Sequence, residues 1–370
     1  MPLDVTQPHP AGAADARRRA VAIWLLVICG MILVMIGLGG ATRLTGSGLS
    51  IMEWAPLRGT LPPLTEAEWQ RLFALYRQIP QYTLLNPDLD LDGFRRIFWL
   101  EYVHRLWGRL IGLAFLLPLL WLWWRGAIDK RLRPRLLVLF MLGGLQGGVG
   151  WFMVASGFFP DSIAVSQYWL VVHLTLALVL YGAILWTALS LLRPASLPGG
   201  PPALRRAVFA CCVLVTVTIV AGGFVAGLKA GLTYNTFPLM DGRIVPDGYG
   251  DLRPAWRNLT ENIAAVQFNH RLLATATAVT VLGTLAWGLT RARGLAKAGL
   301  WALGIAVAVQ YGLGVATLLA VVPPLLGTAH QIVAALVLSA ALLALHGLRP
   351  TAALAHDPLH EDGFRQEGRA

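Results

Sequence analysis

Two short motifs place residues capable of chemistry at the start of long apolar stretches. Glu101 and His104 are three residues apart, so on a helix they share one face. Gln267 and His270 repeat this spacing later in the chain. Ionisable side chains inside membrane spans are costly and mark functional sites by default. These residues are therefore the first candidates for a proton acceptor and for metal ligands.

Two further histidines, His173 and His330, lie in two other apolar stretches. The four histidines form two pairs at comparable distances into their stretches, which a set of unrelated packing residues would not be expected to do. A zinc site usually takes three or four protein ligands. A heme needs only two, because the porphyrin supplies four more. The pairs therefore favour heme binding.

Arginines follow the first histidine of each pair. Arg105 and Arg271 could reach outward to heme propionates with charge-assisted hydrogen bonds. Snorkelling of the same side chains to the outer membrane interface explains them equally well. Both interpretations remain open from the sequence.

Composition predicts an all-α polytopic membrane protein. Of 370 residues, 56% are hydrophobic and 13% charged, against about 25% charged in soluble domains. The net charge of +11 comes mainly from basic residues between apolar stretches, which indicates membrane topology and not nucleic-acid binding. Eight spans are expected, at 21–41, 98–124, 134–155, 165–192, 205–228, 264–290, 298–320 and 325–347.

Basic residues predict the orientation of these spans. Lys and Arg concentrate in alternate short loops, so both termini should be cytoplasmic, and the long loops 42–97 and 229–263 should face outward. A long apolar run follows Arg19 without a small-residue cleavage site, which favours a retained first helix. The three cysteines all lie in apolar stretches, so no disulfide framework is expected.

The chain repeats its motifs, which predicts two four-helix bundles of the same orientation. The matching elements are Gly39-Gly40 and Gly222-Gly223, His104 and His270, Gln146 and Gln310, and His173 and His330. The expected domains are a cytoplasmic segment 1–20, an N-terminal half 21–192, a cytoplasmic linker 193–204, a C-terminal half 205–347 and a cytoplasmic tail 348–370. Facing side chains inside such bundles can hold a cofactor.

These motifs together resemble the heme A synthase family. The resemblance rests on the run from Gly39 to Ser50, on Glu101-Tyr102-Val103-His104-Arg105, on Phe268-Asn269-His270-Arg271 and on Thr328-Ala329-His330-Gln331. It covers roughly residues 20–348. No cysteine pair stands in loop 42–97, so the chain is similar to the cysteine-free branch found in some bacteria and in mitochondria. The N-terminus favours a bacterial plasma membrane.

The resemblance implies a reaction and a division of roles. Family members oxidise a ring methyl of heme O to a formyl group, giving heme A for terminal cytochrome oxidases. By resemblance, His270 and His330 would ligate a heme b, and His104 and His173 would hold the substrate heme. Glu101 would be the catalytic group, since Gln267 cannot act as a base. The pathway suggests a heme O synthase as partner, and a homo-oligomer is left open.

Two other functions compete with this one. A diheme b-type membrane electron-transfer protein would explain four histidines, but not the difference between Glu101 and Gln267. A heme carrier or exporter would bind heme without changing it. Only a synthase would produce heme A or a hydroxylated intermediate.

Overall fold

The structure is a computed structural model that describes residues 10–193 and 199–349. Within these ranges, eight helices are long and apolar enough to cross a membrane, which confirms the expected all-α polytopic architecture. They are α1 Pro10–Leu44, α3 Leu91–Trp124, α4 Arg133–Ala155, α5 Gln167–Leu192, α6 Pro202–Gly227, α7 Ile263–Gly288, α8 Gly294–Leu319 and α9 Pro324–Gly347. Residues 10–20 of the predicted N-terminal segment are helical and belong to α1, and the predicted tail lies outside the described residues from residue 350 onward.

Short helices occupy the segments between the spans. They are α2 Glu66–Tyr76, η1 Arg58–Thr60, η2 Gln81–Leu85, η3 Ala230–Leu232 and η4 Ala255–Leu259. The side chain of Thr65 caps α2 by accepting a hydrogen bond from the backbone N–H of Glu68. Trp69 of α2 then packs edge-on against Phe98 of α3, with ring centroids 4.9 Å apart. α2 is therefore held against the outer part of α3.

α3 begins earlier than its apolar pattern predicts, at Leu91 and not at residue 98. The carboxylate of Asp90 accepts a hydrogen bond of 2.7 Å from the N–H of Gly93 and so caps the new start. Phe94 is fully buried against the aromatic side chains of α2. The helix thus projects beyond its apolar portion because a cap and an external partner stabilise the extra turns.

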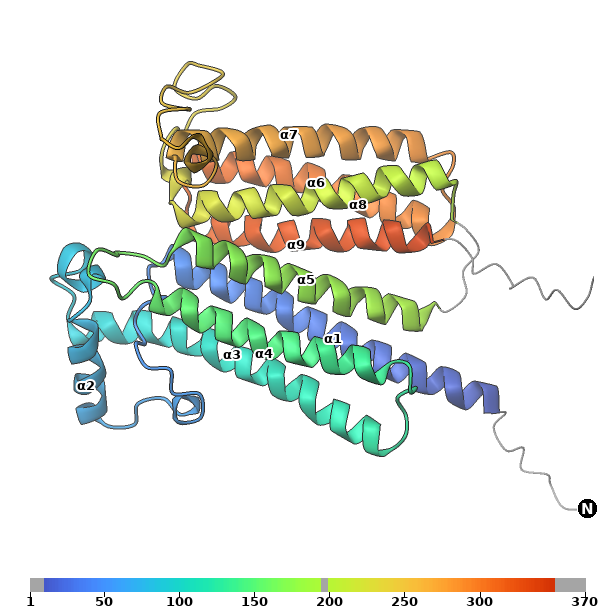
Figure 1. Ribbon diagram of the computed structural model, residues 1–370, viewed down its shortest axis with the longest axis horizontal. Helices are drawn as coiled ribbons and strands as arrows, with labels where there is room; N and C mark the ends of the chain where they lie inside the picture. The colour runs from blue at the N-terminus through green and yellow to red at the C-terminus, as the bar shows by residue number, and fades with distance from the viewer. Residues whose placement is uncertain (1–9, 194–198, 350–370) are drawn as a thin grey trace, which may run out of the picture.

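The spans gather into two sets of four (Figure 1). In the N-terminal set, α3 and α5 each pack against α1 and α4. In the C-terminal set, α7 and α9 each pack against α6 and α8. α3 and α5, like α7 and α9, therefore stand diagonally across their bundles. This is the arrangement in which side chains from two helices can face a group held between them.

The two sets meet through α1 and α5 on one side and α6 and α9 on the other. The hydroxyls of Tyr181 and Ser339 lie 2.7 Å apart across this boundary. Arg43 donates a hydrogen bond of 3.1 Å to the carbonyl of Ala226, near the C-terminal ends of α1 and α6. Close packing and hydrogen bonds between helices are the main source of association in a membrane, where burial of apolar surface adds little.

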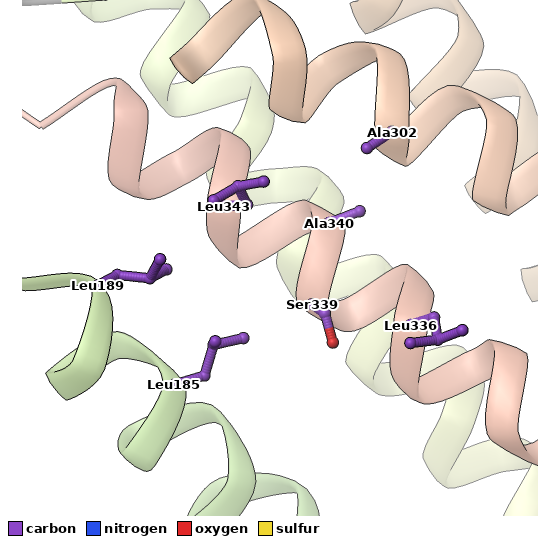
Figure 2. Close-up of a pocket in the computed structure, with 7 residues that line it drawn as sticks. All are labelled: Leu185, Leu189, Ala302, Leu336, Ser339, Ala340 and Leu343. Carbon is purple, nitrogen blue, oxygen red and sulfur yellow. The ribbon is translucent and has the colours of Figure 1, made fainter. Parts of the chain in front are cut away.

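An apolar groove lies at the boundary of the two sets (Figure 2). Its lining comes from α5, α8 and α9: Leu185, Leu189, Ala302, Leu336, Ser339, Ala340 and Leu343. Ser339 is its one polar side chain, and its hydroxyl is already bonded to Tyr181 and to the carbonyl of Ala335. The groove therefore lacks the ionisable or metal-ligating groups that a redox site requires.

Candidate functional site

Each of the four candidate histidines lies against a glycine of the preceding membrane helix. A Cβ added at three of these glycines would stand 2.8–2.9 Å from the imidazole Cε1, and at the fourth 3.2 Å from Nε2. The pairs are Gly150–His173, Gly222–His270, Gly314–His330 and, with the longer contact, Gly39–His104. Any side chain at these positions would press on the ring. The glycines therefore fix where each imidazole can lie.

The four histidines stand at comparable depth. They lie 17 to 20 residues before the cytoplasmic-side ends predicted for α3, α5, α7 and α9. At a rise of about 1.5 Å per residue this places them roughly 25–30 Å from those ends. With a hydrocarbon core of about 30 Å, all four therefore lie toward the same side of the membrane, far from those ends. Each set carries its two histidines on its diagonal pair of helices.

Hydrogen bonds in the C-terminal set leave ligating atoms available. Nδ1 of His270 lies 3.2 Å from the carbonyl oxygen of Thr218. Assigning the ring proton to Nδ1, as this contact requires, leaves the lone pair of Nε2 for a metal. Nδ1 of His330 and Oε1 of Gln310 are buried without a protein partner. Orphaned polar atoms of this kind fit a site that a prosthetic group completes.

Gln146 supports the second histidine of the N-terminal set. Its amide nitrogen donates to the carbonyl of His173 at 3.1 Å and lies 3.2 and 3.3 Å from the two ring nitrogens. Its Oε1 is buried without a partner. Gln310 takes the same place beside His330, with Nε2 3.4 Å from the ring Nε2. Both glutamines thus hold the orientation of a histidine from the neighbouring helix.

The donor set argues for heme and against a metal bound by protein alone. Within the described ranges, no three or more His, Cys, Asp or Glu side chains gather at a point where they could hold a metal ion. The three cysteines there are free and buried apart from the histidines, at Cys29, Cys211 and Cys212. Two imidazoles per set, cradled on glycine, suit an iron that already has four porphyrin ligands.

The carboxylate of Glu101 is buried and fully engaged. Oε1 accepts hydrogen bonds of 2.9 and 2.7 Å from Nε and Nη2 of Arg105. Oε2 accepts from the Ser50 hydroxyl at 2.7 Å and from the Ile51 N–H at 2.9 Å. Glu101 therefore binds α3 to the segment that follows α1.

Gln267 makes the corresponding attachment in the C-terminal set with the opposite polarity. Its amide nitrogen donates to the carbonyls of Ala230 and Thr233, at 2.8 and 2.6 Å. Its Oε1 accepts from Arg271 at 3.2 Å. The segment after α6 offers carbonyls to Gln267, where the segment after α1 offers N–H and O–H donors to Glu101. The N-terminal half thus binds the segment after α1 through a carboxylate, and the C-terminal half binds the segment after α6 through an amide.

The two arginines also bind these external segments. Arg105 donates to the carbonyls of Ile51 and Glu53, and Arg271 donates to two carbonyls of the segment after α6. Most of their donor capacity is therefore used within the protein. Nε of Arg271 is buried and has no protein partner. That N–H is the donor left for an additional group.

Three supporting residues were not predicted from the sequence. Ser50 and Thr218 bond to candidate site residues, but a hydroxyl or a backbone carbonyl carries no sequence signal for such a role. Gly150 follows the repeated Gln146 by four residues, and this spacing by itself gives no sign of a contact with an imidazole. Its contact with one particular imidazole becomes visible only with the helices in place.

Comparison with known proteins identifies the family of this chain. Residues 22–342 match the family described as cytochrome oxidase assembly protein. The chain is 59% identical to a heme A synthase of Granulibacter bethesdensis over 342 residues, 92% of this chain and 90% of that protein. It is 52% identical to a heme A synthase of Rhodospirillum centenum over 353 residues, 93% of this chain and 91% of that one. The chain therefore belongs to the heme A synthase family.

Proposed function

We propose that this chain is an oxidoreductase that converts heme O to heme A by oxidising a ring methyl group to a formyl group. The observation that carries the proposal is the pair of glycine-cradled histidines in each half, found in a chain that belongs to the heme A synthase family. The two halves would then be two repeated four-helix units. One holds the substrate and the other a permanent heme.

His270 and His330 would hold heme b in the C-terminal half. The Thr218 carbonyl supports this role by accepting a hydrogen bond from Nδ1–H of His270. The unpartnered Nδ1 of His330 leaves that ring without a protein hydrogen bond on one side. When bound, heme b supplies a one-electron carrier for the oxidation. Arg271, through its free Nε, is the proposed contact for a propionate.

His104 and His173 would hold heme O in the N-terminal half, with Arg105 beside them. Heme O carries a long isoprenoid chain that heme b lacks, so its site needs additional apolar room. A Cβ added at Gly112, Gly143 or Gly147 would meet no atom within 4 Å. Gly112 lies on the helix face of His104, and the other two lie on the face of Gly150.

The corresponding positions of the C-terminal half carry side chains. By the spacing of the histidine and glutamine motifs, they are Ala278, Val307 and Tyr311. The Tyr311 hydroxyl lies 3.0 Å from that of Thr275 and so joins α8 to α7. The N-terminal half therefore has more room at these positions than the C-terminal half, as the larger heme O requires.

Glu101 is the proposed catalytic carboxylate. Within the described residues it is the one buried carboxylate, and it stands one turn before His104. Methyl oxidation releases protons, and a carboxylate can accept or relay them. Its hydrogen bond from the Ser50 hydroxyl connects it to the segment that follows α1.

The proposed setting is a bacterial plasma membrane with both termini cytoplasmic and the long loops outside. The chain would belong to the branch that lacks a cysteine pair in the first external loop, since residues 42–97 contain no cysteine. A heme O synthase is the proposed supplier of substrate, and membrane lipid surrounds the spans.

Pigment analysis tests the reaction. The chain would be co-expressed with a source of heme O in cells that make no heme A, and the extracted hemes separated by chromatography. Heme A, or a hydroxylated intermediate, is the expected new pigment. Bound heme that remains chemically unchanged would point instead to the electron-transfer protein or the carrier.

A further inference from the structure

The external segment 54–64 exposes an unusual amount of apolar surface. The exposed fractions of Leu57, Leu61 and Leu64 are 82%, 68% and 78%. Trp54 at the start of the segment is 43% exposed. Three large aliphatic side chains this exposed, within eight residues of one loop, would be unfavourable in water. Something apolar must cover them.

Side chains from one face of α3 hold this segment alongside the helix. Tyr102 donates to the carbonyl of Thr60 at 2.6 Å. Arg109 donates to the carbonyls of Pro56 and Ala55, at 3.1 and 3.2 Å. Figure 1 shows the chain between α1 and α2 running beside α3 and not beyond its outer end. The segment therefore reaches well below the start of the helix.

The position of Arg109 sets the depth. It lies 15 residues before Trp124, the inner end of α3, which corresponds to about 22 Å at 1.5 Å per residue. The hydrocarbon core is about 30 Å thick, so Arg109 starts about 8 Å inside its outer boundary if Trp124 marks the inner one. Helix tilt would place it deeper still. The carbonyls that it binds lie near the same level.

Part of the backbone of the segment needs no hydrogen bond from water. Pro56, Pro62 and Pro63 have no N–H group to satisfy. The N–H groups of Gly59, Thr60 and Leu61 bond to carbonyls within the segment. Other carbonyls accept from α3, as described above. The N–H groups of Ala55, Leu57 and Arg58 have no hydrogen-bond partner among the described residues, so they need the polar oxygens of the membrane interface.

We propose that segment 54–64 is immersed in the outer leaflet of the membrane and that lipid acyl chains cover Leu57, Leu61 and Leu64. Its apolar surface continues the lipid-facing side of α3, where Leu113 and Leu117 are 49% and 60% exposed. The segment also reaches α4, because the Trp54 ring packs edge-on against Trp151 at 4.9 Å. It therefore borders the N-terminal half on the membrane side between α3 and α4.

The charges around the segment agree with this placement. Arg71 pairs with Glu53 at 2.8 Å and holds the pKa of that carboxyl below its usual range, so Glu53 stays charged where the segment begins. The loop between α6 and α7 in the C-terminal half has charges next to its apolar side chains. Its exposed Ile244 lies between Arg243 and Asp247, which form an ion pair.

Spin labels in lipid nanodiscs test the placement. Nitroxides would be attached at Leu57→Cys and Leu61→Cys, with Leu117→Cys as the lipid reference and Ile244→Cys as the water reference. Power saturation gives the ratio of accessibility to oxygen and to a water-soluble nickel chelate. Both test positions should match Leu117. Ratios that match Ile244 would overturn the proposal. Unsubstituted protein gives the blank, since its three cysteines are buried.

A second variant tests the attachment through α3. Replacing Arg109 with Gln removes the donors to Ala55 and Pro56, so the label at Leu57 should shift toward the water reference. Arg58→Gln is the matched control, because Arg58 is exposed and should leave the ratio unchanged. Retained heme b would show that each variant is folded. An unchanged ratio in folded Arg109→Gln would show that Arg109 does not hold the segment.

Discussion

Adding one methyl group at Gly314 should weaken heme b binding, whereas the same change at Gly312 should not. A Cβ at Gly314 would stand 2.8 Å from Cε1 of His330, so the imidazole must move. At Gly312, two residues away on the same helix, a Cβ meets nothing within 4 Å. The pair therefore separates displacement of the ligand from a general effect of alanine on α8.

The expected loss follows from the cost of overpacking. One extra carbon in a packed interior costs about 1–3 kcal/mol. If the histidine relieves this strain by leaving its ligating position, heme affinity falls by about 5- to 150-fold, since about 1.4 kcal/mol is a factor of ten. Titration of heme-depleted protein with heme b, followed by absorbance, measures the loss. Equal affinities for Gly314→Ala and Gly312→Ala would refute the role of the glycine as a cradle.

Three further predictions follow from the N-terminal half and the topology. Glu101→Gln should keep heme b but lower heme A formation by about 10²-fold. Ser50→Ala removes one hydrogen bond to the same carboxylate and should lower heme A formation less. Equal losses in the two variants would show that Glu101 only holds the segment after α1 in place. Gly147→Tyr should reduce heme A yield without loss of heme b. An unchanged yield would show that the open space at Gly147 is not needed to bind heme O. Reporter fusions at Pro87 and Asp129 should report opposite sides of the membrane; the same side at both would reject the orientation.

The spans could be predicted closely from the sequence because each is a continuous apolar run. The main departures are the starts of two helices. α1 begins at Pro10 and not at residue 21. The early start of α3 depends on the Asp90 cap and on the packing of Phe94 against α2. Those residues lie in a polar stretch with no apolar run of their own. A hydropathy pattern detects what lipid requires of a helix and misses turns that only protein contacts stabilise.

The histidines could also be predicted, because an ionisable side chain stands out in an apolar run. The side to which the Glu101 carboxylate points could not be predicted. Residues three apart on a helix differ by only about 60° around the axis, so the spacing allowed Glu101 to face either the histidine side or a neighbouring segment. Its contacts are set by how the segment after α1 folds back, which brings Ser50 and Ile51 to the carboxylate. A long external loop gives no local signal of that return.

The division of labour between the halves is tested most directly by the hemes bound to His173→Ala and His330→Ala, purified after co-expression with a source of heme O. The His173→Ala variant should retain heme b and contain no heme A. The His330→Ala variant should lose heme b or its low-spin spectrum. Loss of heme b from His173→Ala, with an intact b-type spectrum in His330→Ala, would contradict the assignment of the substrate to the N-terminal half.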